Sequence, residues 1–207
     1  MKNAIPTPRP RGRPRSFDRD AALAAAMETF WRLGYEGASI ADLTAAMAIT
    51  PQSLYAAFGS KAELYREALT LYRTSAGPSL AARLADAPTV SAALERMLAD
   101  RARTFTRPGR ANGCMISAAV LTSASENQPI ADHLREMRLA SLAGVRAALE
   151  RGKASGEFRP DLDVEATARR LVAMVQGMAV QSRDGASEAD LQCLVAFARE
   201  ELARWRA

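Results

Sequence analysis

Short polar side chains and one tyrosine gather on one side of the segment PQSLYAAF, residues 51–58. At about 100° per residue on a helix, the apolar members fall together on one side, namely Leu54, Ala57 and Phe58. The opposite side carries Gln52, Ser53, Tyr55 and Ala56. Amide, hydroxyl and phenol groups can hydrogen-bond to base edges and phosphates, and a methyl group can meet that of thymine. The pattern therefore indicates a helix that reads DNA, the alternative being a packing helix with a solvated polar face.

Helix start signals place this segment in a helix-turn-helix. Ser39 is a good N-cap for a first short helix, and Asp42 three residues later completes a capping-box pattern. Thr50 can cap the second helix, with Pro51 at the first helical position, where its missing N–H does no harm. Ser60 can cap a third helix. Such a unit places its second helix in the major groove, and Ser39 and Thr50 are expected to offer hydroxyls and helix N-termini to phosphates.

A basic run, RPRGRPR, lies upstream over residues 9–15. Its prolines prevent helix and hold the chain extended, and Gly12 keeps the backbone slim. Such an arm can follow a minor groove, where narrow A/T-rich stretches attract guanidinium groups. We therefore expect Arg11, Arg13 and Arg15 to reach the minor groove, the alternative being a disordered, solubilising tail. Residues 1–61 carry eight Lys/Arg and five Asp/Glu, a net charge of +3 against +2 for the rest, which fits a local DNA footprint.

The run from Asp18 through FWRLGYEGASIADLTAAMAITPQSLYAAFGSKAELYREAL resembles the N-terminal domain of the TetR family of bacterial transcriptional regulators. The resemblance covers roughly residues 16–72, and its pieces stand in the family's order: Phe30 with Gly34-Tyr35, Ser39-Ile40, Thr50, Leu54-Tyr55, Phe58 and Ser60-Lys61. It implies a homodimer of all-helical subunits, each with a three-helix DNA-binding domain and a larger C-terminal domain for an effector and for dimerisation. The family match also implies a phosphate contact for Lys61.

The sequence predicts an all-α chain with a flexible basic arm over 1–15, a helix-turn-helix DNA-binding domain over 16–60 and a C-terminal effector-binding and dimerisation domain over 61–207. Only 6% of the residues are aromatic and Ala and Leu dominate, which favours helices over sheet. Apolar periodicity predicts helices at 18–33, 61–84, 90–106, 114–124, 129–155, 163–182 and 187–206. The helix over 61–84 is expected to connect the two domains.

The last two helices are expected to form the dimer interface. Their broad apolar faces would pack with those of a second copy as a four-helix bundle. The predicted interface residues are Leu171, Val175, Met178, Leu194, Ala198 and Leu202. An intramolecular core is the alternative, and some of these residues must serve in it. A dimer would hold two recognition helices about 34–36 Å apart, so a near-palindromic, double-stranded operator is expected.

The middle helices could enclose an effector pocket. Residues that could surround an apolar ligand are Met97, Phe105, Cys114, Met115, His133, Met137 and Met174. Ordinary core packing is the alternative for each of them. Cys114 follows Asn112-Gly113 at the start of a short predicted helix, where a lowered pKa would make it a reactive sensor thiol. Otherwise it is a small buried hydrophobe.

Several classes of protein do not fit the composition. No apolar run has the length of a membrane span and the N-terminus lacks the apolar segment of a signal peptide, so a cytoplasmic protein with no membrane partner is expected. Two distant cysteines and one histidine indicate neither a disulfide framework nor a metal site, and no cofactor is expected. No phosphate-binding glycine loop, nucleophile elbow or His-carboxylate motif indicates an enzyme.

Three functions remain. The favoured one is a ligand-responsive, sequence-specific transcriptional regulator, a repressor released from its operator when an unidentified small molecule binds the C-terminal domain. The first alternative is an architectural protein that binds A/T-rich DNA through the RPRGRPR arm. The second is a thiol-based redox or electrophile sensor of the same fold that uses Cys114.

Overall fold

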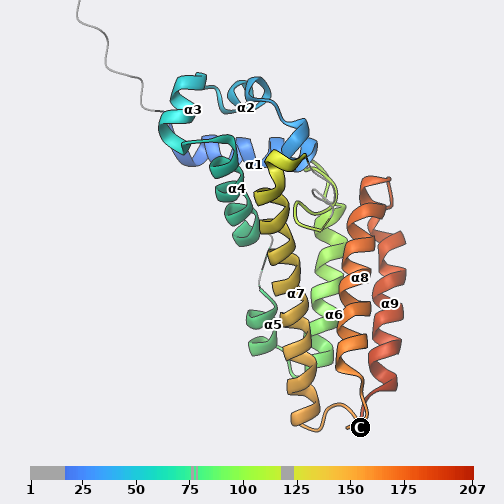
Figure 1. Cartoon of the computed structure of the whole chain (residues 1–207). Coiled ribbons are helices and arrows are strands. Elements are labelled where there is room, and N and C mark those ends of the chain that lie inside the picture. The colour runs from blue at the N-terminus through green and yellow to red at the C-terminus, as the bar shows by residue number, and fades with distance from the viewer. Residues whose placement is uncertain (1–16, 76, 78, 118–123) are drawn as a thin grey trace, which may run out of the picture.

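The computed structural model describes residues 17–75, 77, 79–117 and 124–207, and its regular elements within these ranges are helices (Figure 1). In chain order they are α1 Arg19–Gly37, α2 Ile40–Met47, α3 Pro51–Phe58, α4 Lys61–Ser75, α5 Leu80–Asp86, α6 Val90–Phe105, the 3₁₀ helix η1 Ser125–Asn127, α7 Gln128–Ala154, α8 Val164–Arg183 and α9 Glu188–Arg204. An isolated antiparallel bridge pairs Phe158 with Arg206. The predicted all-α class is confirmed, while the basic arm with Arg11, Arg13 and Arg15 lies outside the described residues.

The helices form a small N-terminal unit set across the end of an upright bundle (Figure 1). Helices α1 to α3 make up this unit, and α1 packs on both α2 and α4. Helices α6 to α9 make up the bundle, in which α6 packs on α9 and α7 packs on α8. The 27-residue helix α7 spans about 40 Å at the usual rise per residue and runs almost the height of the bundle. Within the described residues, no helix is long and apolar enough to cross a membrane.

Side-chain caps delimit the helix-turn-helix where the sequence predicts them. Ser39 Oγ accepts the N–H of Asp42 while the Asp42 carboxylate accepts the N–H of Ser39, which makes a reciprocal capping box. Thr50 Oγ1 caps α3 by accepting the N–H of Ser53 at 3.2 Å. Between the two helices Ala48 turns the chain with a left-handed φ of +54°. These local hydrogen bonds explain why residues 39–58 fold as two short helices rather than one.

Two predicted helices have other bounds in the structure. The helix predicted over 61–84 ends at Ser75, and a separate α5 starts at Leu80. The prediction was wrong because Gly77 adopts a φ of +90° and Pro78, next in the sequence, has no N–H to continue a helix. The helix predicted over 114–124 does not form where the structure describes it, since 115–117 are turns and 118–123 lie outside the described residues.

Aromatic rings join the N-terminal unit to α4. The Phe30 and Tyr65 rings meet edge-to-face with centroids 4.8 Å apart, and Tyr35 lies 5.1 Å from Tyr65. Trp31 meets Tyr72 edge-to-face at 4.9 Å. Each such pair stabilises by about 0.5–1.5 kcal/mol beyond its buried area. Helix α4 therefore shares the hydrophobic core of the N-terminal unit, so a movement of α4 would change the orientation of that unit relative to the bundle.

The two C-terminal helices bury most of their apolar faces within the single chain. Among the predicted interface residues, Leu171, Met178, Ala198 and Leu202 are 0–1% exposed, whereas Val175 and Leu194 are half-buried. The first four are covered without a partner because α8 packs on α6 and α7, and α9 packs on α6. The large apolar side chains that α8 and α9 do expose are Val180, 49% exposed, and Phe197, 53% exposed.

Candidate nucleic-acid interface

Helix α3 presents the face that its sequence predicts. Leu54 and Phe58 are buried at 0% and 4% exposure and anchor the helix on the N-terminal core. Tyr55 is 47% exposed, and Gln52 and Ala56 are exposed beside it. The outward surface therefore offers an amide, a phenol and a methyl group, which are groups that hydrogen-bond or contact base edges in a major groove.

The hydroxyls of Thr50 and Ser53 form a pair at the start of α3. Their oxygens are 3.0 Å apart, and Thr50 Oγ1 also accepts the N–H of Ser53. In such a pair one hydroxyl donates to the other, so one hydroxyl proton remains for an outside acceptor. Pro51 has no N–H and the N–H of Ser53 is already bound, so in the first turn of α3 the N–H of Gln52 joins this hydroxyl pair in serving a phosphate oxygen.

Ser39 is engaged in a different way. Its hydroxyl donates to Asp42 Oδ2 at 2.6 Å, and its N–H donates to the same oxygen at 2.9 Å. These two hydrogen bonds, the hydroxyl's first, lower the pKa of the Asp42 carboxyl below its ordinary value. A negative charge thus already occupies the N-terminus of α2, and a phosphate approaching Ser39 would meet it.

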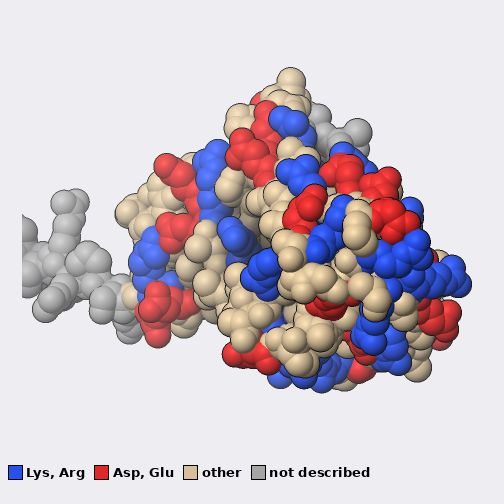
Figure 2. Space-filling view, turned by 90° about the horizontal axis from the view of Figure 1, so that it is seen from below, with Lys and Arg blue, Asp and Glu red and all other residues tan. Residues whose placement is uncertain are grey.

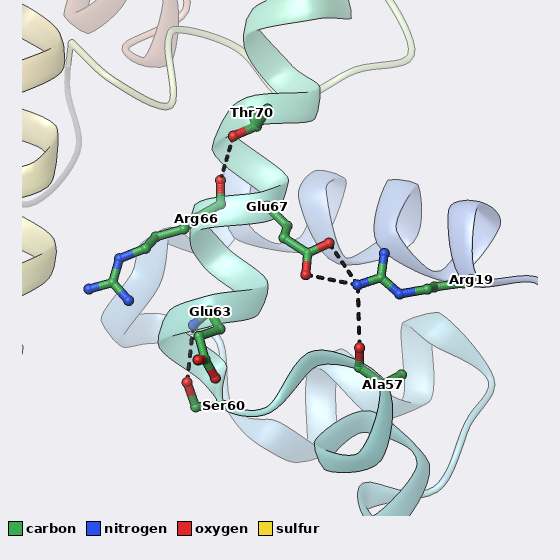
Figure 3. A network of polar contacts seen from close by, with 7 residues as sticks. All are labelled: Arg19, Ala57, Ser60, Glu63, Arg66, Glu67 and Thr70. Atoms are coloured by element: carbon green, nitrogen blue, oxygen red, sulfur yellow. Dashed lines mark hydrogen bonds and ion pairs between the residues drawn. The ribbon is translucent and has the colours of Figure 1, made fainter.

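An arginine outside the predicted site residues fixes the direction of α3 (Figure 3). Arg19 of α1 donates from one Nη atom to both carboxylate oxygens of Glu67 on α4, at 2.8 and 2.9 Å, and to the carbonyl oxygen of Ala57 on α3 at 3.3 Å. Its guanidinium carbon lies 4.3 Å from the centre of the Phe58 ring. Arg19 therefore connects all three helices at the C-terminal end of α3.

Lys61 lies at the first position of α4, beside this unit. Its Nζ is 4.7 Å from the centre of the Tyr35 ring, and the residue is half-buried. Burial lowers the pKa of Lys61, an effect that the nearby Glu36 carboxylate opposes. The ammonium thus lies against the N-terminal core at the N-terminus of α4. Its positive charge and the positive end of the helix dipole both favour an anion there.

The charge at the far end of the bundle does not extend this footprint. At the end of the molecule farthest from α1–α3, basic and acidic side chains intermingle without a face of one sign (Figure 2). The chain as a whole carries a formal net charge of +5. The DNA-contact surface is therefore expected to be local and confined to the N-terminal unit.

The seven predicted effector-pocket residues differ in burial. Met97, Phe105, Cys114 and Met115 are buried, and His133, Met137 and Met174 are half-buried. None of them lines the cavity of about 300 Å³ that lies between α1 and α4 on one side and α5 and α6 on the other. That cavity is instead bordered by charged groups, among them Asp100, Arg103 and Arg107. Residues 100, 103, 104 and 107 have the spacing of one helical face, a signal that apolar periodicity does not reveal.

The two cysteines have different surroundings. Cys114 is 6% exposed, and its Sγ accepts the N–H groups of Ile116 and Ser117, both at 3.4 Å. Burial raises the pKa of the adjacent Tyr72, and the Cys114 thiol raises it further. Cys193 is exposed on α9. In the part of the chain that the structure describes, no group of three His, Cys, Asp or Glu side chains is placed to hold a metal ion.

Comparison with known proteins identifies the class. Residues 22–68 match the family model of bacterial regulatory proteins, tetR family, and residues 91–195 match that of the tetracyclin repressor-like C-terminal domain. The chain is 35% identical to the HTH-type transcriptional repressor ComR of Escherichia coli (strain K12) over 94% of this chain and 92% of ComR. It is 39% identical to the HTH-type transcriptional repressor BdcR of the same organism over 51% of this chain and 53% of BdcR.

A solved structure shows the same arrangement on DNA. A cysteine variant of the TetR family transcriptional regulator CifR, complexed with a 26-bp double-strand operator, has a TM-score of 0.87 and 39% identity, covering 94% of this chain and 100% of that one. A capped helix-turn-helix followed by a helical C-terminal bundle defines a DNA-binding transcriptional regulator. The chain belongs to the TetR family of bacterial transcriptional regulators, as its sequence motifs predict.

Proposed function

We propose that this protein is a sequence-specific repressor that binds a near-palindromic operator as a homodimer and leaves it when a small molecule binds its C-terminal domain. The outward face of α3 carries this proposal, because Tyr55 and Gln52 are exposed while Leu54 and Phe58 anchor the helix from below. The relatives ComR and BdcR, both named as transcriptional repressors, support it. The proposed division is an arm over 1–15, a DNA-binding domain over 16–60 and an effector and dimer domain over 61–207.

Each predicted DNA contact receives a role in this proposal. Gln52, Ser53 and Tyr55 face the major groove, and the Thr50–Ser53 hydroxyl pair donates one proton to a phosphate. Lys61 supplies a phosphate contact at the start of α4. The arm residues predicted for the minor groove are Arg11, Arg13 and Arg15. Ser39 acts chiefly as the cap of α2, since its hydroxyl proton already goes to Asp42.

Fluorescence anisotropy at several salt concentrations tests this function. Labelled DNA from the gene's own promoter is compared with random DNA of equal length, and a preference of roughly 10³-fold or more supports a specific regulator. Equal binding to both DNAs, with a steep salt dependence, would instead favour an architectural protein that binds DNA through the RPRGRPR arm.

The Tyr55→Ala substitution tests the recognition helix in the same assay. Loss of a base contact should weaken promoter binding by about tenfold or more and random-DNA binding much less. Leu139→Ala is the matched control, because Leu139 is also a large exposed side chain, 52% exposed, but lies on α7. If Tyr55→Ala and Gln52→Ala both bind the promoter as the unchanged protein does, α3 is not the reading helix.

The proposed dimer uses the outer surfaces of α8 and α9. Val180 and Phe197 are the large apolar residues exposed there, and Val175 and Leu194 lie half-buried beside the core. A Cβ atom built on Gly177 would meet nothing within 4 Å, so packing inside the chain does not require glycine there. A glycine at this position would instead allow a helix of the second copy to approach α8 closely.

Sedimentation velocity tests the dimer. Phe197→Glu should convert a dimer into a monomer at micromolar concentration, because a buried, unpaired carboxylate opposes association strongly. Leu139→Glu, which adds the same charge at an exposed apolar site on α7, should remain a dimer. A Phe197→Glu protein that sediments as the unchanged dimer would place the interface elsewhere.

Cys114 supports a second hypothesis, in which the same repressor responds to electrophiles. Two backbone N–H groups, those of Ile116 and Ser117, donate to its Sγ and hold the sulfur in a fixed position. The test is operator release after treatment with N-ethylmaleimide in Cys193→Ser protein, which leaves Cys114 as the reactive thiol. Release that persists in the Cys114→Ser, Cys193→Ser double variant would contradict this reading.

A further inference from the structure

The cavity of about 300 Å³ lies at the junction between the DNA-binding unit and the bundle. Trp31 of α1 and Tyr72 of α4 form its wall on the DNA-binding side. The opposite wall comes from α5, α6 and the turn after α6. Its volume is at the lower end of the range for small-molecule sites, so a compact ligand fits it.

The lining of this cavity carries more positive than negative charge. Its guanidinium groups belong to Arg83, Arg103, Arg107 and Arg110, and its carboxylate is that of Asp100. Arg83 and Arg103 share that one carboxylate, each pairing with a different oxygen. Arg110 Nε lies 3.7 Å from Glu28 of α1, the outer limit of an ion pair. The carboxylates around the cavity are therefore too few to neutralise the four arginines.

Arg107 is the guanidinium that is open to a ligand. It is exposed, and no ion pair joins it to a carboxylate among the described residues. A guanidinium offers a planar fork of N–H donors that matches carboxylate and phosphate oxygens in pairs. The opposite wall is formed by the aromatic residues Trp31 and Tyr72.

We propose that this cavity binds a small organic anion, a compact molecule bearing a carboxylate or phosphate group, and that this anion is the effector. The inference rests on the repressor function proposed above and adds the place and the charge of the ligand. Arg103 and Arg107 hold the acidic group, and the body of the ligand lies toward Trp31 and Tyr72.

The position of the cavity explains how occupancy reaches the DNA. Trp31 donates its indole N–H to the Gly113 carbonyl oxygen at 3.2 Å, and its own carbonyl oxygen accepts from Arg183 of α8 at 2.9 Å. One residue of α1 thus contacts α4, the turn before residue 114 and α8. A ligand that binds one orientation of α1 and α4 against α6 better than another shifts the equilibrium between the two.

Tryptophan fluorescence measures binding directly. The chain has two tryptophans, so Trp205→Phe leaves Trp31 as the reporter at the cavity wall. Benzoate and inorganic phosphate are titrated at constant ionic strength, and benzamide serves as the neutral analogue of benzoate. We expect a saturable change in Trp31 emission with at least one of the two anions and none with benzamide. A response to benzoate alone identifies a carboxylate ligand, and a response to phosphate alone identifies a phosphate ligand.

The Arg107→Gln substitution tests the role of this arginine in the Trp31 response. Loss of a charge-assisted contact should raise the apparent Kd for the anion by about tenfold or more. Arg96→Gln is the matched control, because Arg96 is an exposed arginine of α6 that does not line the cavity. The saturating anion should also change operator affinity by about fivefold or more in the Trp205→Phe protein and not in Arg107→Gln at the same concentration.

Three outcomes would overturn the proposal: no response of Trp31 to either anion, an equal response to benzamide, or the same apparent Kd in Arg107→Gln and Arg96→Gln. Operator binding without any anion is measured in the same series. If operator binding is intact but the anions have no effect, this inference fails and the repressor function stands. If no operator is bound specifically, the proposed function fails, whatever the anions do to Trp31.

Discussion

Arg19 should control DNA binding without touching DNA. Its guanidinium joins Glu67, the Ala57 carbonyl oxygen and the Phe58 ring at the C-terminal end of α3. We predict that Arg19→Ala lets α3 tilt or fray on the N-terminal core, so that its reading face meets the major groove at a higher free-energy cost.

The magnitude follows from the exposure of the contacts. The side chains of Arg19 and Glu67 are 45% and 38% exposed, so their ion pair stabilises by at most about 1 kcal/mol. The cation–π contact with Phe58 adds about 0.5–1 kcal/mol, and the hydrogen bond to Ala57, long at 3.3 Å, adds about 0.5 kcal/mol. Since such terms overlap, the total is about 1–2 kcal/mol. We expect a decrease in Tm of about 2–8 °C and operator binding weaker by about 5- to 30-fold.

Anisotropy with operator DNA and thermal unfolding together measure the effect. Arg73→Ala is the control, because Arg73 is an exposed arginine in the last turn of α4 with no ion pair within the described residues. The Glu67→Gln substitution distinguishes whether Arg19 acts by holding α3 in place or by contacting a DNA phosphate. It should weaken operator binding in the same direction as Arg19→Ala, with an unchanged salt slope, if Arg19 acts by holding α3.

Two results would refute this reasoning. One is an unchanged Tm and operator affinity in both Arg19→Ala and Glu67→Gln. The other is tighter operator binding by Glu67→Gln combined with a shallower salt slope in Arg19→Ala, because a freed Arg19 would then be pairing with a phosphate.

Three further outcomes are expected. Because Ser39 lowers the pKa of Asp42 below the ordinary 3.8, the capping box stabilises α2 fully above pH of about 4 and weakens as the pH falls further. Asp42→Asn should abolish the acid-induced shift of the Ser39 amide NMR signal, and persistence of that shift would contradict the assignment. Gly113→Ala should destabilise the chain by about 2–4 kcal/mol in chemical denaturation, since φ is +81° and the added Cβ would lie 2.7 Å from the Ala179 carbonyl oxygen. A change below about 0.5 kcal/mol would show that the turn relaxes freely. If Cys114, 6% exposed, is a buried hydrophobe rather than a sensor, it should react with iodoacetamide at least about tenfold more slowly in the native than in the unfolded chain, and equal rates would favour the electrophile-sensor interpretation.

Local signals in the sequence predicted what local chemistry determines. The caps at Ser39, Thr50 and Ser60 lie within three residues of the N–H groups they accept, so their effect is readable without the fold. The outward face of α3 follows from its helical period for the same reason. By contrast, the break after Ser75 was missed because the apolar spacing continues across Gly77 and Pro78, and the backbone chemistry of these two residues outweighed it.

Contacts between distant segments could not be predicted. Arg19 and Glu67 are 48 residues apart, and nothing in either neighbourhood indicates the other. The apolar residues Met178 and Ala198 were predicted in the dimer interface, with an internal core as the alternative, and the packing of α8 and α9 on α6 buries both of them within the single chain. The arginine-lined cavity depends on the meeting of α1, α4, α5 and α6, whereas apolar periodicity indicates only apolar pocket walls.

The eight residues of α3 set a limit on how much sequence the protein can read. At 1.5 Å per residue the helix is about 12 Å long, which corresponds to about three or four base pairs of B-DNA. Two copies would specify about six to eight base pairs, and a given eight-base sequence recurs by chance about once in 65,000 positions. A bacterial chromosome of a few million positions would then hold dozens of accidental matches, by the same order-of-magnitude count. In the proposed dimer, the distance between the two half-sites would then add to the sequence specificity, because only operators with the matching spacing could contact both copies of α3 at once.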